Sequence, residues 1–314
     1  MHASTKSRNR ASPKSVRITE QRNSRSAALD TKSALEILRI INREDRKVAG
    51  AVAKVIPQIA RAVDLAVDAL ARGGRLVYLG AGTSGRLGVL DAAECIPTFG
   101  TEQVVAVMAG APESMFRPSE VSEDDPELGE RDVRKIKFGR DDVLVGISAS
   151  GRTPYVLGGL RYARRLGASR VLLTANPQAE GQGLATVLIA PVVGPEVIAG
   201  STRMKAGTAQ KLVLNMLSTA TMVRLGRVFS NLMIGVQLTN SKLRERALGI
   251  LMEITSADAA RARRALENAG HNLPVALLML AKGIERSEAM AMLRAESRTA
   301  QVLRQACGLF SRLT

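Results

Sequence analysis

Three segments of the chain combine glycine with closely spaced hydroxyl side chains, a pattern that suits phosphate binding. Backbone N–H groups at helix N-termini attract anions, glycine lets a ligand approach the backbone, and hydroxyl groups add hydrogen-bond donors. The candidate binding residues are Thr83, Ser84, Gly85 and Arg86 in the first loop (80–86), Ser148, Ser150, Gly151 and Thr153 in the second loop (146–154), and Ser201 and Lys205 in the third loop (200–208). Because three such loops are hard to explain as separate helix caps, they predict one shared phosphosugar pocket.

The first loop by itself also fits other ligands. No lysine stands where a Walker loop requires one, but Gly80, Gly82 and Gly85 have the G-x-G-x-x-G spacing of dinucleotide-binding turns. Glu102 stands about twenty residues further on, where such proteins place an acidic residue for the ribose. The spacing therefore permits a nucleotide or a purely structural turn beside the phosphosugar that the hydroxyl pair favours.

The scarcity of histidine limits the acid/base chemistry. Only His2 and His271 occur, and His271 follows Gly270 between two predicted helices, where a turn residue is expected. A catalytic triad, a histidine-ligated metal site and histidine acid/base catalysis are therefore disfavoured. We expect no metal and no cofactor, and we expect carboxylates, lysine or tyrosine to carry any proton transfer.

The elements that position these loops alternate between strands and helices. Short apolar runs predict strands at 75–79, 103–108, 142–147, 170–174 and 187–192, and helical patterns lie between them at 84–94, 126–136 and 153–165. This order predicts an α/β fold with a doubly wound, parallel five-stranded sheet. Ligands of such sheets bind beyond the carboxyl ends of the strands, where the hydroxyl-rich loops fall.

The sequence predicts that the chain is divided into three parts. Residues 1–18 form a basic tail that is expected to be disordered, and residues 19–245 form the α/β domain with an N-terminal helical extension. In that extension, Ser33 and Glu36 have capping-box spacing for a short helix, and a second helix is predicted from 46 to 72. Residues 246–314 form a small domain of three or four helices at 247–254, 257–268, 273–282 and 286–294, with Ser256 as a cap.

Composition excludes several classes of protein. The net charge of +16 would suit a nucleic-acid binder, but the surplus is spread along the chain and aromatic residues make up only 3%. No apolar run is long enough to cross a membrane, and the first residues lack the apolar core of a secretory signal. Because Cys95 and Cys307 are its only cysteines, the chain is not expected to have a disulfide framework. We therefore expect a cytoplasmic protein that binds neither nucleic acid nor membrane.

Several long motifs carry a resemblance to a known family. GAGTSGRLGVLDAAEC at 80–95 and PTFG at 97–100 resemble the signature of N-acetylmuramic acid 6-phosphate etherases. The same family pattern appears in TEQRN at 19–23, SGRTPY at 150–155 and GSTRMKAGTAQKLVLNM at 200–216. The resemblance covers nearly the whole chain from residue 19. It implies a sugar isomerase (SIS) domain, a homodimer and a small C-terminal domain similar to ubiquitin-associated domains.

The resemblance also implies a reaction and two catalytic residues. The reaction cleaves the D-lactyl ether at C3 of N-acetylmuramate 6-phosphate by elimination and then hydration, in the recycling of cell-wall amino sugars. Ring opening to an aldehyde acidifies the C2 proton, a base removes it, and an acid protonates the departing lactate oxygen. By the resemblance, Glu94 is the proton donor and Glu123, in the segment that matches Glu-Gly-Ala-Glu-Asp, is the base.

Two features near the expected site need explanation. The family's Ala-Val-Glu-Gly-Ala reads Pro-Ser-Glu-Val-Ser at 118–122, and a gained proline and a lost glycine are expected to shift that loop. The family's Cys-Pro-Pro and Asn-Pro likewise become Cys95-Ile96-Pro97 and Asn23-Ser24. On a continuous helix, Glu94 lies roughly 15 Å from Ser84, too far for one sugar phosphate to bridge. Either that helix ends early, or Glu94 serves the pocket of a partner subunit.

A non-catalytic phosphosugar sensor is the alternative function. The glucokinase regulatory protein resembles the same family and binds without reacting, but it carries two tandem SIS domains and this chain carries one. The presence of both Glu94 and Glu123 also favours catalysis. A phosphosugar isomerase is a third possibility, which the scarcity of histidine disfavours.

Overall fold

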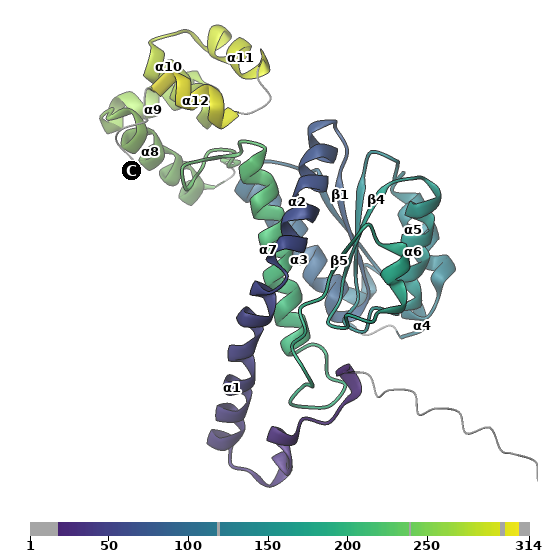
Figure 1. Cartoon of the computed structure of the whole chain (residues 1–314). Coiled ribbons are helices and arrows are strands. Elements are labelled where there is room, and N and C mark those ends of the chain that lie inside the picture. The colour runs from purple at the N-terminus through teal and green to yellow at the C-terminus, as the bar shows by residue number, and fades with distance from the viewer. Residues whose placement is uncertain (1–17, 118–119, 239, 296–298, 308–314) are drawn as a thin grey trace, which may run out of the picture.

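The centre of the molecule is a parallel sheet of five strands in the order β2-β1-β3-β4-β5 (Figure 1). The computed structural model describes residues 18–117, 120–238, 240–295 and 299–307. The strands are β1 (Leu76–Gly80), β2 (Val104–Met108), β3 (Val143–Ile147), β4 (Ser169–Leu173) and β5 (Val187–Ile189). The α/β prediction is confirmed, and each strand begins at or next to the expected residue, although β5 ends three residues early.

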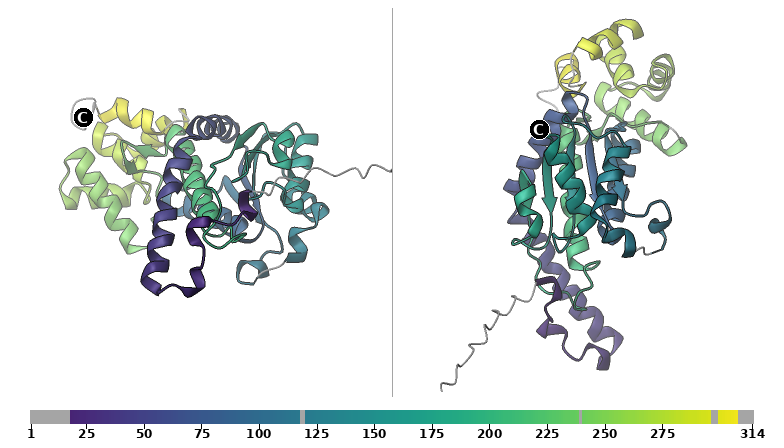
Figure 2. Two further views of the ribbon diagram at one scale, coloured as in Figure 1. Left: turned by 60° about the horizontal axis from the view of Figure 1, so that its bottom comes forward. Right: turned by 90° about the vertical axis from the view of Figure 1, so that its right-hand side faces the viewer.

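Helices cover both faces of this sheet (Figures 1 and 2). Leu76 and Tyr78 of β1 pack on one face with α2 (Ile56–Ala71), α3 (Gly82–Phe99) and α7 (Lys205–Arg224). Val77 and Leu79 pack on the other face with α5 (Pro126–Lys135) and α6 (Pro154–Arg165). Successive strand side chains point to opposite faces, so an apolar run without alternation is buried on both sides.

The N-terminal helix α1 (Ala34–Ala53) extends beyond the sheet as an arm, together with the short 3-10 turns η1 (Ile18–Glu20), η2 (Ser24–Ser26) and η3 (Leu29–Thr31) (Figure 1). The predicted capping box is confirmed, because the Ser33 side chain accepts from the Glu36 amide and the Glu36 carboxylate accepts from the Ser33 amide. The predicted boundary between the first two helices is wrong. The structure breaks the helix between α1 and α2, where Pro57 lies in the first turn of α2, and proline cannot donate to a preceding helical turn.

The C-terminal part is a separate cluster of short helices. These are α8 (Ser241–Thr255), α9 (Ala259–Asn268), α10 (Leu273–Lys282), α11 (Arg286–Ala295) and α12 (Thr299–Cys307), one more than the sequence predicts. Their apolar core also includes residues near the hairpin of β6 (Val228–Phe229) and β7 (Leu232–Met233), such as Phe229 and Ile234. Ser256 ends α8 in the left-handed conformation, while the side chain of Asp258 caps α9.

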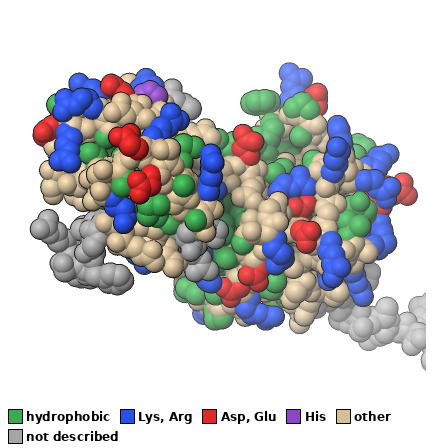
Figure 3. Space-filling model, turned by 90° about the horizontal axis from the view of Figure 1, so that it is seen from above, with side chains coloured by type: hydrophobic (Ala, Val, Ile, Leu, Met, Phe, Trp, Pro, Cys, Tyr) green, Lys and Arg blue, Asp and Glu red, His purple; other side chains and the backbone are tan. Residues whose placement is uncertain are grey.

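Surface charge and helix composition bear on the expected partners. On the face seen in Figure 3, Lys and Arg side chains are interspersed with acidic and neutral ones, as expected of a generic basic surface. Among the described residues, no helix is long and apolar enough to cross a membrane. The predicted disordered tail (1–18) lies outside the described residues except for Ile18.

Candidate active site

The first loop forms a tight strand-to-helix turn at the carboxyl end of β1. The helix begins at Gly82, which has a φ of +52°, so Thr83 and Ser84 lie in its first turn. A Cβ on Gly85 would lie 2.7 Å from the carbonyl oxygen of Gly80, so the two backbone segments touch only because position 85 has no side chain. This arrangement leaves the unpaired N–H groups of α3 at the strand end, as an anion site requires.

The second loop forms a hydroxyl cluster at the carboxyl end of the neighbouring strand β3. The Ser148 hydroxyl oxygen accepts from the Gly151 amide at 3.0 Å and lies 2.8 Å from the Thr153 hydroxyl oxygen. Ser150 lies at the edge of this cluster, 3.4 Å from Ser148. Gly151 has a φ of +72°, a conformation that favours glycine.

Glu123 lies between these two loops. It is the last residue of the short helix α4 (Glu120–Glu123), and its Oε1 accepts from the Thr153 hydroxyl at 3.3 Å. A Cβ on Gly82 would lie 4.0 Å from Glu123 Oε2, which places the carboxylate beside the first loop as well. Residues 118–119 of the altered segment lie outside the described residues, but that segment still delivers Glu123 to the predicted pocket.

The hydrogen bonds of this cluster run from Ser148 through Thr153 to Glu123. Because Ser148 Oγ already accepts from the Gly151 amide, its own hydrogen is available for Thr153 Oγ1. Thr153 then donates to Glu123, and an ionised carboxylate can only accept. Thr153 therefore contacts the carboxylate of Glu123, and a contact between Thr153 and the substrate stays a prediction.

The third loop meets the first loop through the start of α7. A Cβ on Gly207 would lie 3.4 Å from Thr83 Cγ2, and the Ser84 hydroxyl donates to Gln210 Oε1 at 2.9 Å. Ser201 is half-buried at the start of the third loop. The structure thus brings all three predicted loops together at the carboxyl ends of β1 and β3.

Lys205 has a strong partner outside these loops. Its side chain is only 1% exposed, and its Nζ donates to Glu44 Oε2 of α1 at 2.7 Å. Burial by itself would raise the pKa of Glu44, but hydrogen bonds from Lys205, Lys47 and Asn23 outweigh burial and lower that pKa to about 2. The Lys205 amide also donates to the buried carboxylate of Glu196. Lys205 therefore joins the arm to α7, and substrate contact by Lys205 stays a prediction.

Arg86 is likewise engaged by protein atoms. Its Nε donates to the Met115 carbonyl oxygen at 2.9 Å, and its Nη2 donates to the Ser114 carbonyl oxygen at 2.6 Å. These bonds fix the segment before α4, which carries Glu123. Sequence spacing could not reveal this role, because the two partners lie almost thirty residues away.

Glu94 lies apart from this cluster within one chain. Helix α3 runs without interruption from Gly82 to Phe99, and Glu94 is exposed on it, ten residues after Ser84. The idea that the helix ends early is therefore wrong. At 1.5 Å per residue, roughly 15 Å of helix separates Glu94 from the first loop.

Two buried groups near Glu94 were missed by sequence reasoning. The Asp91 carboxylate accepts from the Tyr78 hydroxyl at 2.8 Å and from the Asn215 side-chain amide at 2.6 Å, so it ties α3 to β1 and α7. An isolated aspartate on the inward face of an otherwise apolar helix is the signal that could have found it. Burial, and next the charge of Asp91, raises the pKa of the Cys95 thiol to about 12, so this cysteine is a poor nucleophile.

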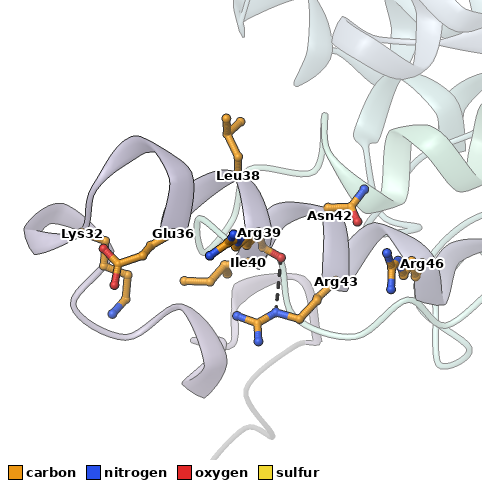
Figure 4. A pocket seen from close by; sticks show the side chains of 8 residues that line it. All are labelled: Lys32, Glu36, Leu38, Arg39, Ile40, Asn42, Arg43 and Arg46. Carbon is orange, nitrogen blue, oxygen red and sulfur yellow. Dashed lines mark hydrogen bonds between the residues drawn. The ribbon is translucent and has the colours of Figure 1, made fainter.

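Open hollows occur along the arm, and one of them reaches Lys205 of the third loop. One of about 590 Å³ lies along α1, and half of the residues that line it are basic (Figure 4). Another of about 630 Å³ lies beside Lys205, where the arm meets the loop after β5. In the described part of the chain, no three His, Cys, Asp or Glu residues lie together as a metal site would require.

Comparison with known proteins identifies close relatives. The chain is 53% identical to N-acetylmuramic acid 6-phosphate etherase of Edwardsiella ictaluri (strain 93-146) and 50% identical to that of Klebsiella aerogenes, each over 88% of this chain and 93% of the relative. A family model of the glucokinase regulatory protein N-terminal SIS domain matches residues 58–164. A putative phosphosugar isomerase of Bacteroides fragilis, known from its crystal structure, is 23% identical with a TM-score of 0.47, over 60% of this chain and 91% of that one.

Proposed function

Because this chain belongs to the N-acetylmuramic acid 6-phosphate etherase family, we propose that it cleaves the D-lactyl ether of N-acetylmuramate 6-phosphate. The products are N-acetylglucosamine 6-phosphate and D-lactate. The observation that carries the proposal is the position of Glu123, whose carboxylate is held by Thr153 between two hydroxyl-rich loops at adjacent strand ends. A base beside an anion pocket is what proton abstraction from a sugar phosphate requires.

In this mechanism the first loop binds the phosphate through the N-terminus of α3 and the Ser84 hydroxyl. Glu123 removes the C2 proton of the ring-opened sugar, whose aldehyde stabilises the resulting negative charge. The C3–O bond then breaks, and the leaving lactate oxygen takes a proton from Glu94. Water adds across the new double bond, with its oxygen at C3 and a proton returned to C2, so that both carboxyl groups regain their starting states.

We further propose that Glu94 acts in the site of a second copy. The separation along α3 keeps Glu94 from the first loop of its own chain, and Leu90, one helical turn before it, is 52% exposed. Leu38 on the arm is 63% exposed, a second apolar surface that another copy would cover. A homodimer that covers these surfaces could bring Glu94 of one copy to Glu123 of the other.

The first experiment measures D-lactate release from N-acetylmuramate 6-phosphate by the parent protein and by Glu94→Ala and Glu123→Ala. We expect release by the parent and at least a hundredfold loss in each variant, since a positioned acid or base contributes about 10²–10⁴-fold. Tight phosphosugar binding without lactate release would instead favour the sensor, the function suggested by the matched regulatory-protein domain.

The cytoplasm is the proposed compartment, and residues 246–314 are the proposed small helical domain.

Subunit mixing tests the shared site. If Glu94 acts in the partner's site, dimers of Glu94→Ala with Glu123→Ala contain one complete site, and random mixing restores about a quarter of parental activity. Mixing Glu94→Ala with the doubly substituted chain is the matched control, because it completes no site. Mixed dimers that form but release no lactate would refute the shared site and leave the etherase proposal standing.

A further inference from the structure

Gln210 is a buried amide with one unsatisfied end beside the first loop. Its side chain, in the second turn of α7, is 2% exposed, and its Oε1 accepts the Ser84 hydroxyl hydrogen at 2.9 Å. Its Nε2 is buried and has no hydrogen-bond partner among the described residues. A buried donor without a partner costs free energy, so its presence needs an explanation.

The observed bond conflicts with phosphate binding by Ser84. A phosphate dianion only accepts hydrogen bonds, and the hydroxyl of Ser84 has a single hydrogen to donate. In the unliganded chain that hydrogen goes to Gln210 Oε1. Ser84 can therefore donate to a phosphate only if Gln210 gives it up.

Rotation of the carboxamide resolves this conflict without moving the helices. The two ends of the glutamine amide have nearly the same shape, so a half-turn places Nε2 where Oε1 was. Nε2 then donates to Ser84 Oγ, and the Ser84 hydrogen becomes free for a phosphate oxygen. A hydrogen bond to a charged group is stronger than a neutral one, so bound phosphate favours the rotated state.

We propose that Gln210 is a positioning residue that releases the Ser84 hydroxyl hydrogen to the substrate phosphate by turning its amide over. The proposal rests on phosphate binding at the first loop, which is part of the proposed function. Because the far end of the amide bonds no described residue, the carboxamide can turn over without breaking a second hydrogen bond.

The test uses the near-isosteric variant Gln210→Met together with Ser84→Ala. Binding of N-acetylglucosamine 6-phosphate, measured by calorimetry, should weaken roughly 10- to 100-fold in Ser84→Ala, the range for a hydrogen bond to a charged group. Gln210→Met removes the acceptor that competes for the Ser84 hydrogen together with the amide donor that replaces it, so its binding should stay within about threefold of the parent, and the double variant should bind no worse than Ser84→Ala. Gln210→Glu, which only accepts, should weaken binding at least as much as Ser84→Ala.

Thermal unfolding separates this role from a structural one. Gln210→Met removes a buried unsatisfied donor but also removes the acceptor of the Ser84 hydroxyl, so its melting temperature should stay close to that of the parent. Gln58→Glu is the matched control for Gln210→Glu, since Gln58 of α2 also has a buried unsatisfied amide atom but lies in none of the three loops. The control should bind the phosphosugar like the parent.

Three results would overturn the inference. These are unchanged binding in Gln210→Glu, a loss of binding in Gln210→Met as large as that in Ser84→Ala, and a loss in Gln210→Glu that appears only with a lowered melting temperature. If the parent binds the phosphosugar but releases no D-lactate, the etherase proposal fails and the Gln210 comparison remains valid. A parent that binds no phosphosugar refutes both.

Discussion

Replacing Thr153 by valine removes a hydroxyl from the candidate site and keeps the shape of the side chain. Thr153 Oγ1 is the hydroxyl that donates to Glu123 Oε1 at 3.3 Å, and it lies 2.8 Å from Ser148 Oγ. Its side chain is buried beneath the second loop. The substitution therefore frees the carboxylate to rotate away from the C2 proton without opening a cavity.

The size of the effect follows from the length of this bond. Hydrogen bonds to charged groups contribute about 1.5–3 kcal/mol, and a bond of 3.3 Å lies at the weak end of that range. A loss of about 1.4 kcal/mol corresponds to a tenfold lower rate. We expect kcat for lactate release to fall about tenfold in Thr153→Val, with KM nearly unchanged because binding of the phosphate is left intact.

The assay compares Thr153→Val with Thr153→Ser, which keeps the hydroxyl. D-lactate release gives kcat and KM, and loss of a C2 deuterium label from the substrate reports the base step directly. Thr153→Ser should retain most of kcat and of C2 exchange. Equal losses in the two variants would show that the methyl group matters and the hydroxyl does not. A rise in KM with unchanged kcat would indicate that Thr153 contacts the phosphate, as the sequence predicts.

Two further predictions concern stability and the first loop. The folded-state pKa of Glu44, about 2 against an ordinary 4.5, means that its stabilisation is complete above pH 4.5 and is lost as the pH falls toward 2. Urea unfolding should therefore show the parent more stable than Glu44→Gln at pH 7, by about 3 kcal/mol or more, with a gap that narrows below pH 4.5; a constant gap would contradict this. Gly85→Ala should lower the melting temperature and abolish phosphosugar binding, since its Cβ would lie 2.7 Å from the backbone oxygen of Gly80. Gly50→Ala in α1, where a Cβ meets nothing within 4 Å, should leave binding unchanged, and loss of binding there would point to a nonspecific effect of added methyl groups.

The sheet and its loops were predictable because their signals are local. A strand buried on both faces reads as an apolar run, and a tight strand-to-helix turn needs glycine at fixed positions such as Gly85. The order of these elements then limits the fold to a parallel sheet with its ligand site at the strand ends. This is why the positions of Thr83, Ser148 and Ser201 relative to the sheet could be predicted. The contacts of their side chains with a substrate stay predictions.

The roles of charged residues were harder to foresee because their partners are distant in sequence. Lys205 pairs with Glu44, 161 residues away, and Arg86 binds carbonyl oxygens that any residue would offer. A charged side chain that binds a ligand and one in a structural ion pair have the same appearance in a sequence. Burial separates the two cases, and Lys205 is almost fully buried.

The continuity of α3 has the largest consequence for mechanism. The sequence left two explanations for the distance between Glu94 and the first loop, and an unbroken helix from Gly82 to Phe99 removes one of them. The inward side of the same helix is fixed by Asp91, whose bonds to Tyr78 and Asn215 prevent α3 from turning Glu94 toward its own loop. If Glu94 is the acid, its partner base must therefore come from another copy, so a monomeric variant should keep phosphosugar binding and lose lactate release.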